Sequence, residues 1–320
     1  MTPVLRADLH VHSCHSKVSG TMPFLGSRDC YSAPADVYRV AKARGMDLVA
    51  LTDHDSIEGA LELFDARPDA DDVIIGEEVS CRWPGVELAV HLGVYGMTES
   101  LHREVQPLRG NVFDVTARLR QADVFFSLNH LLHFYRGQIP FDHYLRLLDE
   151  VPALEVRNGT MDAAHNALAE SIIERRGVTR PASPLGVVAG SDAHTLRRVG
   201  TTWTAAPGSS REDFLISLRQ GLGRPEGLHG TAATVAGDAY GVIGRYLAAL
   251  AGRGPGDLPP LRRAACVAFA AMTLPFQFMP LAIAAASKER ERREVARAIE
   301  HLAAAGGRKT VSAVRLQARS

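Results

Sequence analysis

The amino-acid sequence predicts an α/β fold, in which a barrel of seven βα units is followed by a mainly helical C-terminal region. Short runs rich in Val, Leu and Ile alternate with amphipathic segments of helical length, which is typical of a largely parallel sheet. Seven such runs lie within roughly 190 residues, and this density favours a βα barrel over a sandwich. Beyond about residue 205 the alternation fades, so we expect a separate C-terminal part.

The expected strands are the apolar runs 4–12, 47–54, 72–80, 87–96, 124–130, 153–159 and 184–192. Between several of them lie the expected helices 33–45, 56–66, 111–122 and 161–177. Some of these helices begin at a Ser, Asp or Asn and end at a Gly, as helix capping predicts. We therefore expect a barrel at 1–207, a linker and barrel rim at 208–230, and a helical region of unknown role at 231–320.

Composition narrows the classes of function. The chain has 320 residues, of which 46% are hydrophobic and 22% are charged, as in an ordinary soluble globular protein. Lys plus Arg and Asp plus Glu both total 36, so no general basic surface for nucleic acid is predicted. The four cysteines show no CxxC spacing, which argues against a zinc ribbon or a disulfide framework. Without a secretory signal at the N-terminus, we expect a cytoplasmic protein.

Metal-capable side chains gather at the ends of the expected strands. In "ADLHVHSCHS", His10 and His12 are two residues apart and so point to the same face of a strand. The other groups are Asp53 and His54, Glu77 and Glu78, His91, Asn129 and His130, Glu155 and Asn158, and Asp192 and His194. Most of these groups lie at or near the C-terminal end of a strand, where the loops of a βα barrel build the active site. The sequence therefore predicts a metal centre at this end of the barrel.

The motifs "DLHVHS", "TDHD", the Glu after "GE", the later histidines and "GSDAH" carry a family resemblance. Their order and separations resemble those of the PHP (polymerase and histidinol phosphatase) superfamily of metal-dependent phosphoesterases. The resemblance covers residues 4–205. It implies a distorted seven-stranded barrel that holds two or three divalent ions, usually zinc, manganese or iron, and that hydrolyses phosphate esters.

The resemblance also implies a set of ligands. For one ion these are His10, His12, Glu78 and Asp192, and for a second ion they are His91 and His130, with Glu78 bridging both. Glu78 is preferred to Glu77 because the family's glutamate stands two residues after the glycine, here Gly76. Imidazoles and carboxylates suit borderline divalent ions, and two such ions can clamp the attacking and leaving oxygens of a phosphoryl displacement.

A third ion would use His54, His194 and a ligand from the loop after "HVH". Many relatives have an Asp there, where this chain has Lys17, and His15 is a candidate replacement. If this ion is absent, His54 and His194 could bind phosphate or protonate the leaving oxygen, so the candidate catalytic residues are His54, His194 and Asp192. Lys17 and Arg136 are candidates for binding the substrate phosphate, although both could equally be surface side chains.

The C-terminal region contains an uncharged run at residues 264–287 that is long enough to span a membrane. Two prolines, Pro275 and Pro280, and many alanines favour instead a pair of buried helices that break at the prolines. Membrane contact through 264–287 thus stays open but is not favoured.

The sequence predicts hydrolysis of a small phosphomonoester by a metal-activated water. Two alternatives remain open: a phosphodiesterase or nuclease, which would need a basic track, and a non-catalytic docking module. We expect a small phosphorylated substrate as the partner and no nucleic acid.

Overall fold

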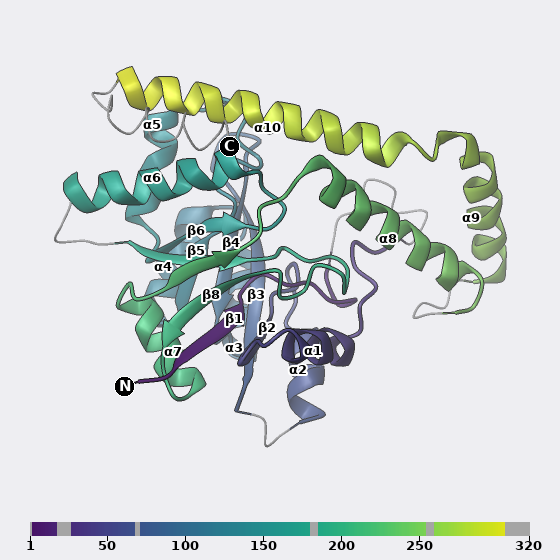
Figure 1. Cartoon of the computed structure of the whole chain (residues 1–320), viewed down its shortest axis with the longest axis horizontal. Coiled ribbons are helices and arrows are strands. Elements are labelled where there is room, and N and C mark those ends of the chain that lie inside the picture. Colours follow the sequence, from purple (N-terminus) through teal and green to yellow (C-terminus); the bar gives the residue numbers. More distant parts are fainter. Residues whose placement is uncertain (1, 18–26, 68–70, 180–184, 254–258, 305–320) are drawn as a thin grey trace.

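All seven strands predicted from the sequence are present in the computed structural model, which describes residues 2–17, 27–67, 71–179, 185–253 and 259–304 (Figure 1). Within the described residues they belong to one nine-stranded sheet with the order β7-β6-β5-β4-β3-β2-β1-β8-β9. The strands are β1 Val4–Asp8, β2 Leu48–Leu51, β3 Val73–Arg82, β4 Ala89–Tyr95, β5 Phe125–Leu128, β6 Ala153–Asn158, β7 Gly186–Gly190, β8 Thr202–Pro207 and β9 Arg224–Gly227.

The sheet curls into a nearly closed barrel because β1 has two different neighbours along its length. Residues 4–7 pair antiparallel with β8, whereas Val11, beyond the end of β1, forms a parallel bridge with Ala193, beyond the end of β7. A side chain joins β7 to β8: the Thr204 hydroxyl accepts a hydrogen bond from the Ala189 N–H at 2.7 Å and donates one to the Ala189 carbonyl at 2.9 Å. Buried backbone groups at the seam between β7 and β8 therefore have hydrogen-bond partners although the two strands do not form a continuous β-ladder.

The expected distorted (βα)7 barrel is corrected in two respects. Strand β4 runs antiparallel to both β3 and β5, because only residues 83–88 connect it to β3 and a helical crossover needs a longer segment. Strands β8 and β9 were not predicted, since "TWTAAP" and "RPEG" are not apolar runs. The range predicted as linker and barrel rim, 208–230, contains helix α7 (Arg211–Arg219) and strand β9. The reversal of β4 brings the first residues of that strand to the end of the barrel where β1, β2, β3, β5, β6 and β7 finish.

Helices cover the outside of the barrel: α1 Pro34–Ala43, α2 Glu58–Asp65, α3 Glu99–Val105, α4 Val112–Gln121, α5 Phe141–Tyr144, α6 Ala163–Thr179 and α7 Arg211–Arg219, with the short 3-10 turns η2 Gln106–Leu108 and η3 Leu145–Asp149. Several begin at a side-chain cap, for example α4, where the Asn111 side chain accepts the Phe113 N–H. Strands β2 and β5 are buried along their whole length, which explains why they read as continuous apolar runs.

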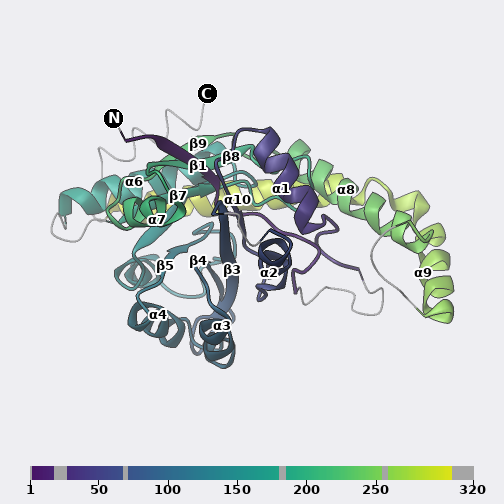
Figure 2. The same cartoon turned by 90° about the horizontal axis from the view of Figure 1, so that it is seen from below.

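The C-terminal region forms an arm of helices α8 Ala232–Leu250, α9 Pro260–Met272 and α10 Met279–Ala304, with the 3-10 turn η4 Leu274–Phe276 between the last two. Helix α10 crosses the barrel near α5 and α6, and α9 stands away from the barrel (Figures 1 and 2). The second half of α10 enters the main core through Val295, Ala298, Ile299 and Leu302. This half fixes the arm to the barrel.

The expectation of buried helices at 264–287 is wrong as to burial, although the helices do break near Pro275. Phe276, Phe278 and Ile283 are 56%, 60% and 60% exposed. The segment packs on the rest of the arm through a small cluster that includes Leu250 and Cys266, and the second half of α10 already occupies the place on the barrel core. No described helix is by itself long and apolar enough to cross a membrane, whereas the pair Pro260–Met272 and Leu274–Ala303, bent by 56°, passes that test on length and composition.

We predict that Thr204→Val destabilises the protein. Valine has the same shape but no hydroxyl, so the Ala189 N–H and carbonyl lose a buried partner, at a cost of about 2 to 4 kcal/mol. Urea unfolding would measure the loss. Thr204→Ser, which keeps the hydroxyl, is the control, and equal stability of the two variants would contradict this explanation of the seam.

Candidate metal centre

Six histidines and three carboxylates from separate parts of the chain converge at one end of the barrel. His10 and His12 follow β1, His54 follows β2, and His130 follows β5. Glu78 lies within β3, His91 within β4, Asp192 and His194 just after β7, and Asp29 in the segment before α1. His91 stands near the start of its strand and reaches this end only because β4 is reversed.

The Glu78 carboxylate lies at the centre of this group and is completely buried. Its Oε2 is 3.1 Å from His10 Nε2 and 3.1 Å from His54 Nδ1. Its Oε1 is 3.2 Å from His91 Nδ1 and 3.0 Å from His130 Nε2. The two oxygens thus face different pairs of imidazoles, as a carboxylate bridging two cations would.

Glu77 points to the opposite face of β3. Its carboxylate lies 2.8 Å from His102 Nδ1 and accepts a hydrogen bond from the Gln106 amide at 2.8 Å. Alternation along the strand thus separates the two glutamates, and Glu78 is the one that faces the histidines.

The converging side chains form four overlapping groups in which ligand atoms are close enough to hold a metal ion. They are His12, Asp29, His54 and His194; His10, Glu78 and His130; His10, His12 and Asp192; and His54, Glu78 and His91. Sharing of residues between groups means that neighbouring ions would lie close together, as in two-metal phosphoryl-transfer sites.

Several buried polar atoms in the cluster lack hydrogen-bond partners within the described chain, and their chemistry shows whether a cation would fit here. His10 Nε2, His12 Nε2, His54 Nδ1, His91 Nδ1 and Glu78 Oε2 are buried without a hydrogen-bond partner among the described residues. Buried polar atoms without partners are costly, yet all five are directed into the same cluster. Imidazole nitrogens and carboxylate oxygens are ligands for zinc, manganese or iron, so this donor set fits divalent ions of that kind.

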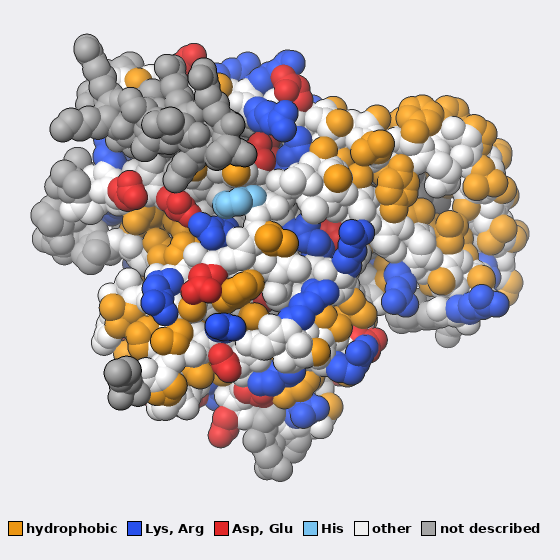
Figure 3. Space-filling model, viewed as in Figure 1, with side chains coloured by type: hydrophobic (Ala, Val, Ile, Leu, Met, Phe, Trp, Pro, Cys, Tyr) orange, Lys and Arg blue, Asp and Glu red, His pale blue; other side chains and the backbone are white. Residues whose placement is uncertain are grey.

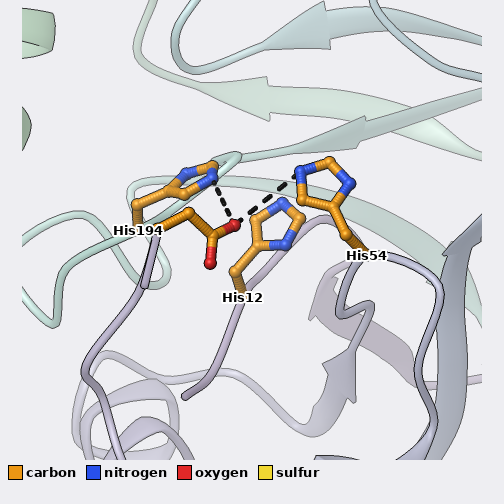
Figure 4. A group of neighbouring side chains, drawn as sticks. His12, His54 and His194 are labelled. Carbon is orange, nitrogen blue, oxygen red and sulfur yellow. Dashed lines mark ion pairs between the residues drawn. The ribbon is translucent and has the colours of Figure 1, made fainter. Parts of the chain in front are cut away.

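Asp29 is the member of the cluster that sequence reasoning missed. One of its carboxylate oxygens lies 3.5 Å from His194 Nε2 and 3.9 Å from His54 Nε2. Figure 4 shows the rings of His12, His54 and His194 close together. The sequence analysis sought this ligand at position 17 or 15. The only signal in the sequence was that Asp29 is an acidic residue in the same long loop as His15 and Lys17. The length of a loop does not predict which of its residues reaches the site.

The structure places three of the predicted site residues elsewhere. His15 Nε2 is 2.7 Å from a Glu62 carboxylate oxygen, and Lys17 Nζ is 3.0 Å from Glu58, so both interact with helix α2. Arg136 is exposed and donates hydrogen bonds to the carbonyls of its own loop. Of the predicted site residues, these three lie apart from the cluster, and Asp29 occupies the place considered for His15.

Carboxylates and amides behind the cluster fix the orientation of its members. Glu155 accepts the backbone N–H of His130 at 2.8 Å and lies 2.9 Å from His10 Nδ1, which leaves His10 Nε2 directed at Glu78. The Asn129 amide donates to Glu78 Oε1 at 3.0 Å, and the Thr160 hydroxyl donates to Asp192 at 2.8 Å. Glu155 and Asn129 thus have the supporting role that ligand-orienting residues play in metal sites.

Backbone strain is concentrated in the same place. His130 and Asp192 adopt positive φ angles of 26° and 52°, a conformation that L residues rarely occupy. Gly190 precedes Asp192 by two residues, and a Cβ there would lie 2.3 Å from the Cβ of His10. Glycine at 190 is therefore required for β7 to approach the first motif.

The charges of the cluster are strongly coupled. Burial alone would raise the pKa of Glu78, but the imidazoles of His10, His91 and His54 hold that pKa well below its usual range. Burial lowers the pKa of His54 well below its ordinary value, despite the attraction of Glu78. Burial opposes the charge on His194 too, yet Asp29 and Asp192 raise its pKa to about 9. Metal ligation needs neutral imidazole, so protons and metal ions compete for these nitrogens.

The cluster opens into a cavity of about 490 Å³. One side consists of the histidines and carboxylates, including His133, and the other side of Val235, Ala239, Val242 and Ile243 from helix α8. Helix α10 adds Lys288, which is the one Lys or Arg side chain among the described lining residues. The cavity therefore combines a polar, metal-capable floor with an apolar wall that belongs to the C-terminal arm.

His165 lies behind the cluster and has a structural role. Its Nε2 accepts the backbone N–H of Leu132 at 3.2 Å, which supports the loop that carries His130. Burial lowers the pKa of His165 to about 3, so the ring stays neutral in the folded protein.

Comparisons with known proteins place this geometry in context. A family model described as PHP-associated matches residues 164–222, a range that contains Asp192 and His194. The uncharacterized protein MJ1587 of Methanocaldococcus jannaschii is 34% identical over 76 residues, which are 23% of this chain and 44% of that protein. The chain thus aligns with less than half of the length of that relative.

Three solved structures are similar at 18% identity. A two-domain protein from Bacteroides vulgatus containing a predicted PHP-like metal-dependent phosphoesterase aligns over 71% of this chain and 66% of its own, with a TM-score of 0.45. The lesion-specific endonuclease PfuEndoQ from Pyrococcus furiosus aligns over 70% and 57%, with a TM-score of 0.46. PsfC from Pseudomonas syringae aligns over 75% and 98%, with a TM-score of 0.49.

We predict that Asp29→Asn weakens metal binding by the group of His12, Asp29, His54 and His194 at least about tenfold, because the anionic ligand becomes a neutral amide of the same shape. Titration with Zn²⁺ or Mn²⁺ under competition from a chelator would measure the loss. Lys17→Ala and His15→Ala serve as controls, because both side chains contact α2. If the control variants bind metal more weakly and Asp29→Asn does not, the assignment of Asp29 as the ligand is wrong.

We predict that His165 makes stability depend on pH. Its folded pKa of about 3 lies below the unfolded value of about 6.5, so the unfolded chain binds an extra proton between these values and stability falls as pH falls. The expected contribution is about 1.4 kcal/mol per pH unit between pH 6 and pH 4. Urea unfolding at several pH values, with a chelator present, would measure the free energy of unfolding. Its dependence on pH should be correspondingly weaker for His165→Gln and unchanged for the control His301→Gln, which alters an exposed residue.

Proposed function

From the relationship of this chain to the PHP superfamily, which the motif series and the PHP-associated match support, we propose that it is a metal-dependent phosphoesterase acting on a small phosphomonoester. The observation that carries the proposal is the position of Glu78 between two pairs of imidazoles at the floor of a cavity. Such an arrangement presents metal-ligand atoms directly to a bound ester.

Bound divalent ions would supply Lewis-acid chemistry, stabilising charge on the phosphoryl oxygens and activating a water molecule. The residues of the chain do the rest. Glu78 and Asp192 provide buried negative charge, and Glu155 holds His10 and the His130 backbone in place. His54 and His194 line the cavity and face the ester, where they can ligate, bind phosphate oxygens or protonate the leaving oxygen.

The size and lining of the cavity favour a small substrate rather than a polymer. A volume of about 490 Å³ suits a molecule of metabolite size, and one wall is apolar. A nucleic-acid strand needs a basic track along its backbone, whereas the described lining residues include Lys288 as their one Lys or Arg. Lys288 is itself held by the Thr160 carbonyl and the Glu291 carboxylate.

We predict that protein loaded with Mn²⁺ or Zn²⁺ releases phosphate from phosphomonoesters faster than it cleaves phosphodiesters or DNA. Glu78→Gln should lower this turnover at least about a hundredfold, because both groups that share its oxygens lose an anionic ligand. Phosphate release over a panel of esters is the measurement, with the metal content of each sample determined in parallel.

Glu77→Gln is the matched control, since it makes the same chemical change one residue away on the opposite face of β3. Diester or DNA cleavage that exceeds monoester turnover would replace the proposal with the phosphodiesterase alternative. Metal bound at the expected residues with no turnover of any ester would favour the docking-module alternative.

A further inference from the structure

The C-terminal arm carries the largest collection of exposed apolar side chains on the described surface. They lie on α9, on η4 and its flanks, and on the first turns of α10: Leu261, Val267, Met272, Leu274, Phe276, Phe278, Met279, Leu281 and Ile283, each between 43% and 85% exposed. Figure 3 shows hydrophobic side chains gathered over the part of the molecule that the arm forms. Exposed apolar surface of this extent on a soluble fold marks an interaction site.

Most side chains at the end of the arm are exposed. Within residues 271–287, all of which the structure describes, only Ala284 is buried. Helix α9 packs on α8 through Cys266, while Leu261, Val267 and Met272 are exposed. An exposed apolar surface of this kind suits the apolar medium of a membrane interface.

The stretch of the arm from Ala239 to Lys288 is predominantly basic. From Ala239 to Lys288 the sequence has five basic residues and one acidic residue, Asp257, which lies outside the described residues. The whole chain is neutral, with 36 basic and 36 acidic side chains, so this stretch concentrates positive charge. Arg245, Arg253 and Arg262 are exposed.

We propose that the arm docks on an anionic lipid bilayer, with the apolar corner at η4 inserted shallowly among the lipids and the arginines at the level of the headgroups. Apolar side chains and arginines together are the pattern of interfacial membrane-binding elements. The bend of 56° between α9 and α10 forms a corner that enters the interface without crossing the bilayer. Docking leaves the cavity accessible, because the cavity is lined by other residues of α8 and α10.

Charge argues against a second copy of the chain as the occupant. Two arms packed together through this stretch would bring basic side chains near basic side chains. Phosphate groups of anionic lipids carry the opposite charge.

The test uses the full chain and sedimentation with vesicles of phosphatidylcholine, with or without phosphatidylglycerol. We expect binding to the anionic vesicles that is at least about tenfold stronger than to the neutral ones and that weakens with salt. Phe276→Gln with Phe278→Gln should lower binding at least about tenfold. Arg245→Gln with Arg253→Gln should lower binding to anionic vesicles to a similar extent and leave binding to neutral vesicles unchanged.

Each variant has a matched control on the barrel. Ile216→Gln with Leu222→Gln removes two apolar side chains that are 50% and 46% exposed, and Arg39→Gln with Arg103→Gln removes the same net charge as the arginine pair. Both controls should bind vesicles like the parent. Absence of vesicle binding, or equal losses in arm variants and controls, overturns the proposal. If the parent protein forms dimers but does not bind vesicles, and the Phe276→Gln, Phe278→Gln variant does not form dimers, the surface belongs to an interface with a second copy instead.

Discussion

The Glu78 carboxylate lies within 3.2 Å of ring nitrogens from His10, His54, His91 and His130, and the rest of the site is arranged around this contact. One buried negative charge cannot balance several charged imidazoles, and four imidazole nitrogens of the cluster have no hydrogen-bond partner among the described residues. Asp192 and Glu155 add negative charge on one side of the group, and Asp29 adds it on the other. A divalent cation would provide partners for the unpaired nitrogens and so compensate for the missing hydrogen bonds.

The barrel makes this arrangement possible through its strand register. In the antiparallel pair of β3 and β4, Glu78 stands opposite Gly93, and His91 stands opposite Ser80, so Glu78 and His91 are diagonal neighbours on one face. Gly93 leaves the space in front of Glu78 to the Asn129 amide, because a Cβ at Gly93 would lie 2.9 Å from Asn129 Oδ1. A parallel β4 would place His91 at the far end of the barrel, so the reversal of one strand is a functional feature of this fold.

These features separate what sequence reasoning could and could not predict. The apolar pattern of the sequence predicts the seven strands. Strands β2 and β5, for example, are buried on both faces and therefore appear as continuous apolar runs. The short connection of residues 83–88 could have indicated that β4 is antiparallel to β3, because a helical crossover needs a longer segment. Asp29 reaches the cluster through the path of a loop, and periodicity has no bearing on such a path. The exposure of Phe276 and Phe278 could not be predicted either, because apolar composition is the same for a buried helix and for one that binds another surface.

Hydrogen bonds connect the arm with the cluster. Helix α10 runs without interruption from the exposed Met279 to the buried Leu302. Between them, the Lys288 ammonium donates to the Thr160 carbonyl, and the Thr160 hydroxyl donates to Asp192. Two hydrogen-bonded steps therefore join the helix that carries the apolar corner to a carboxylate of the cluster.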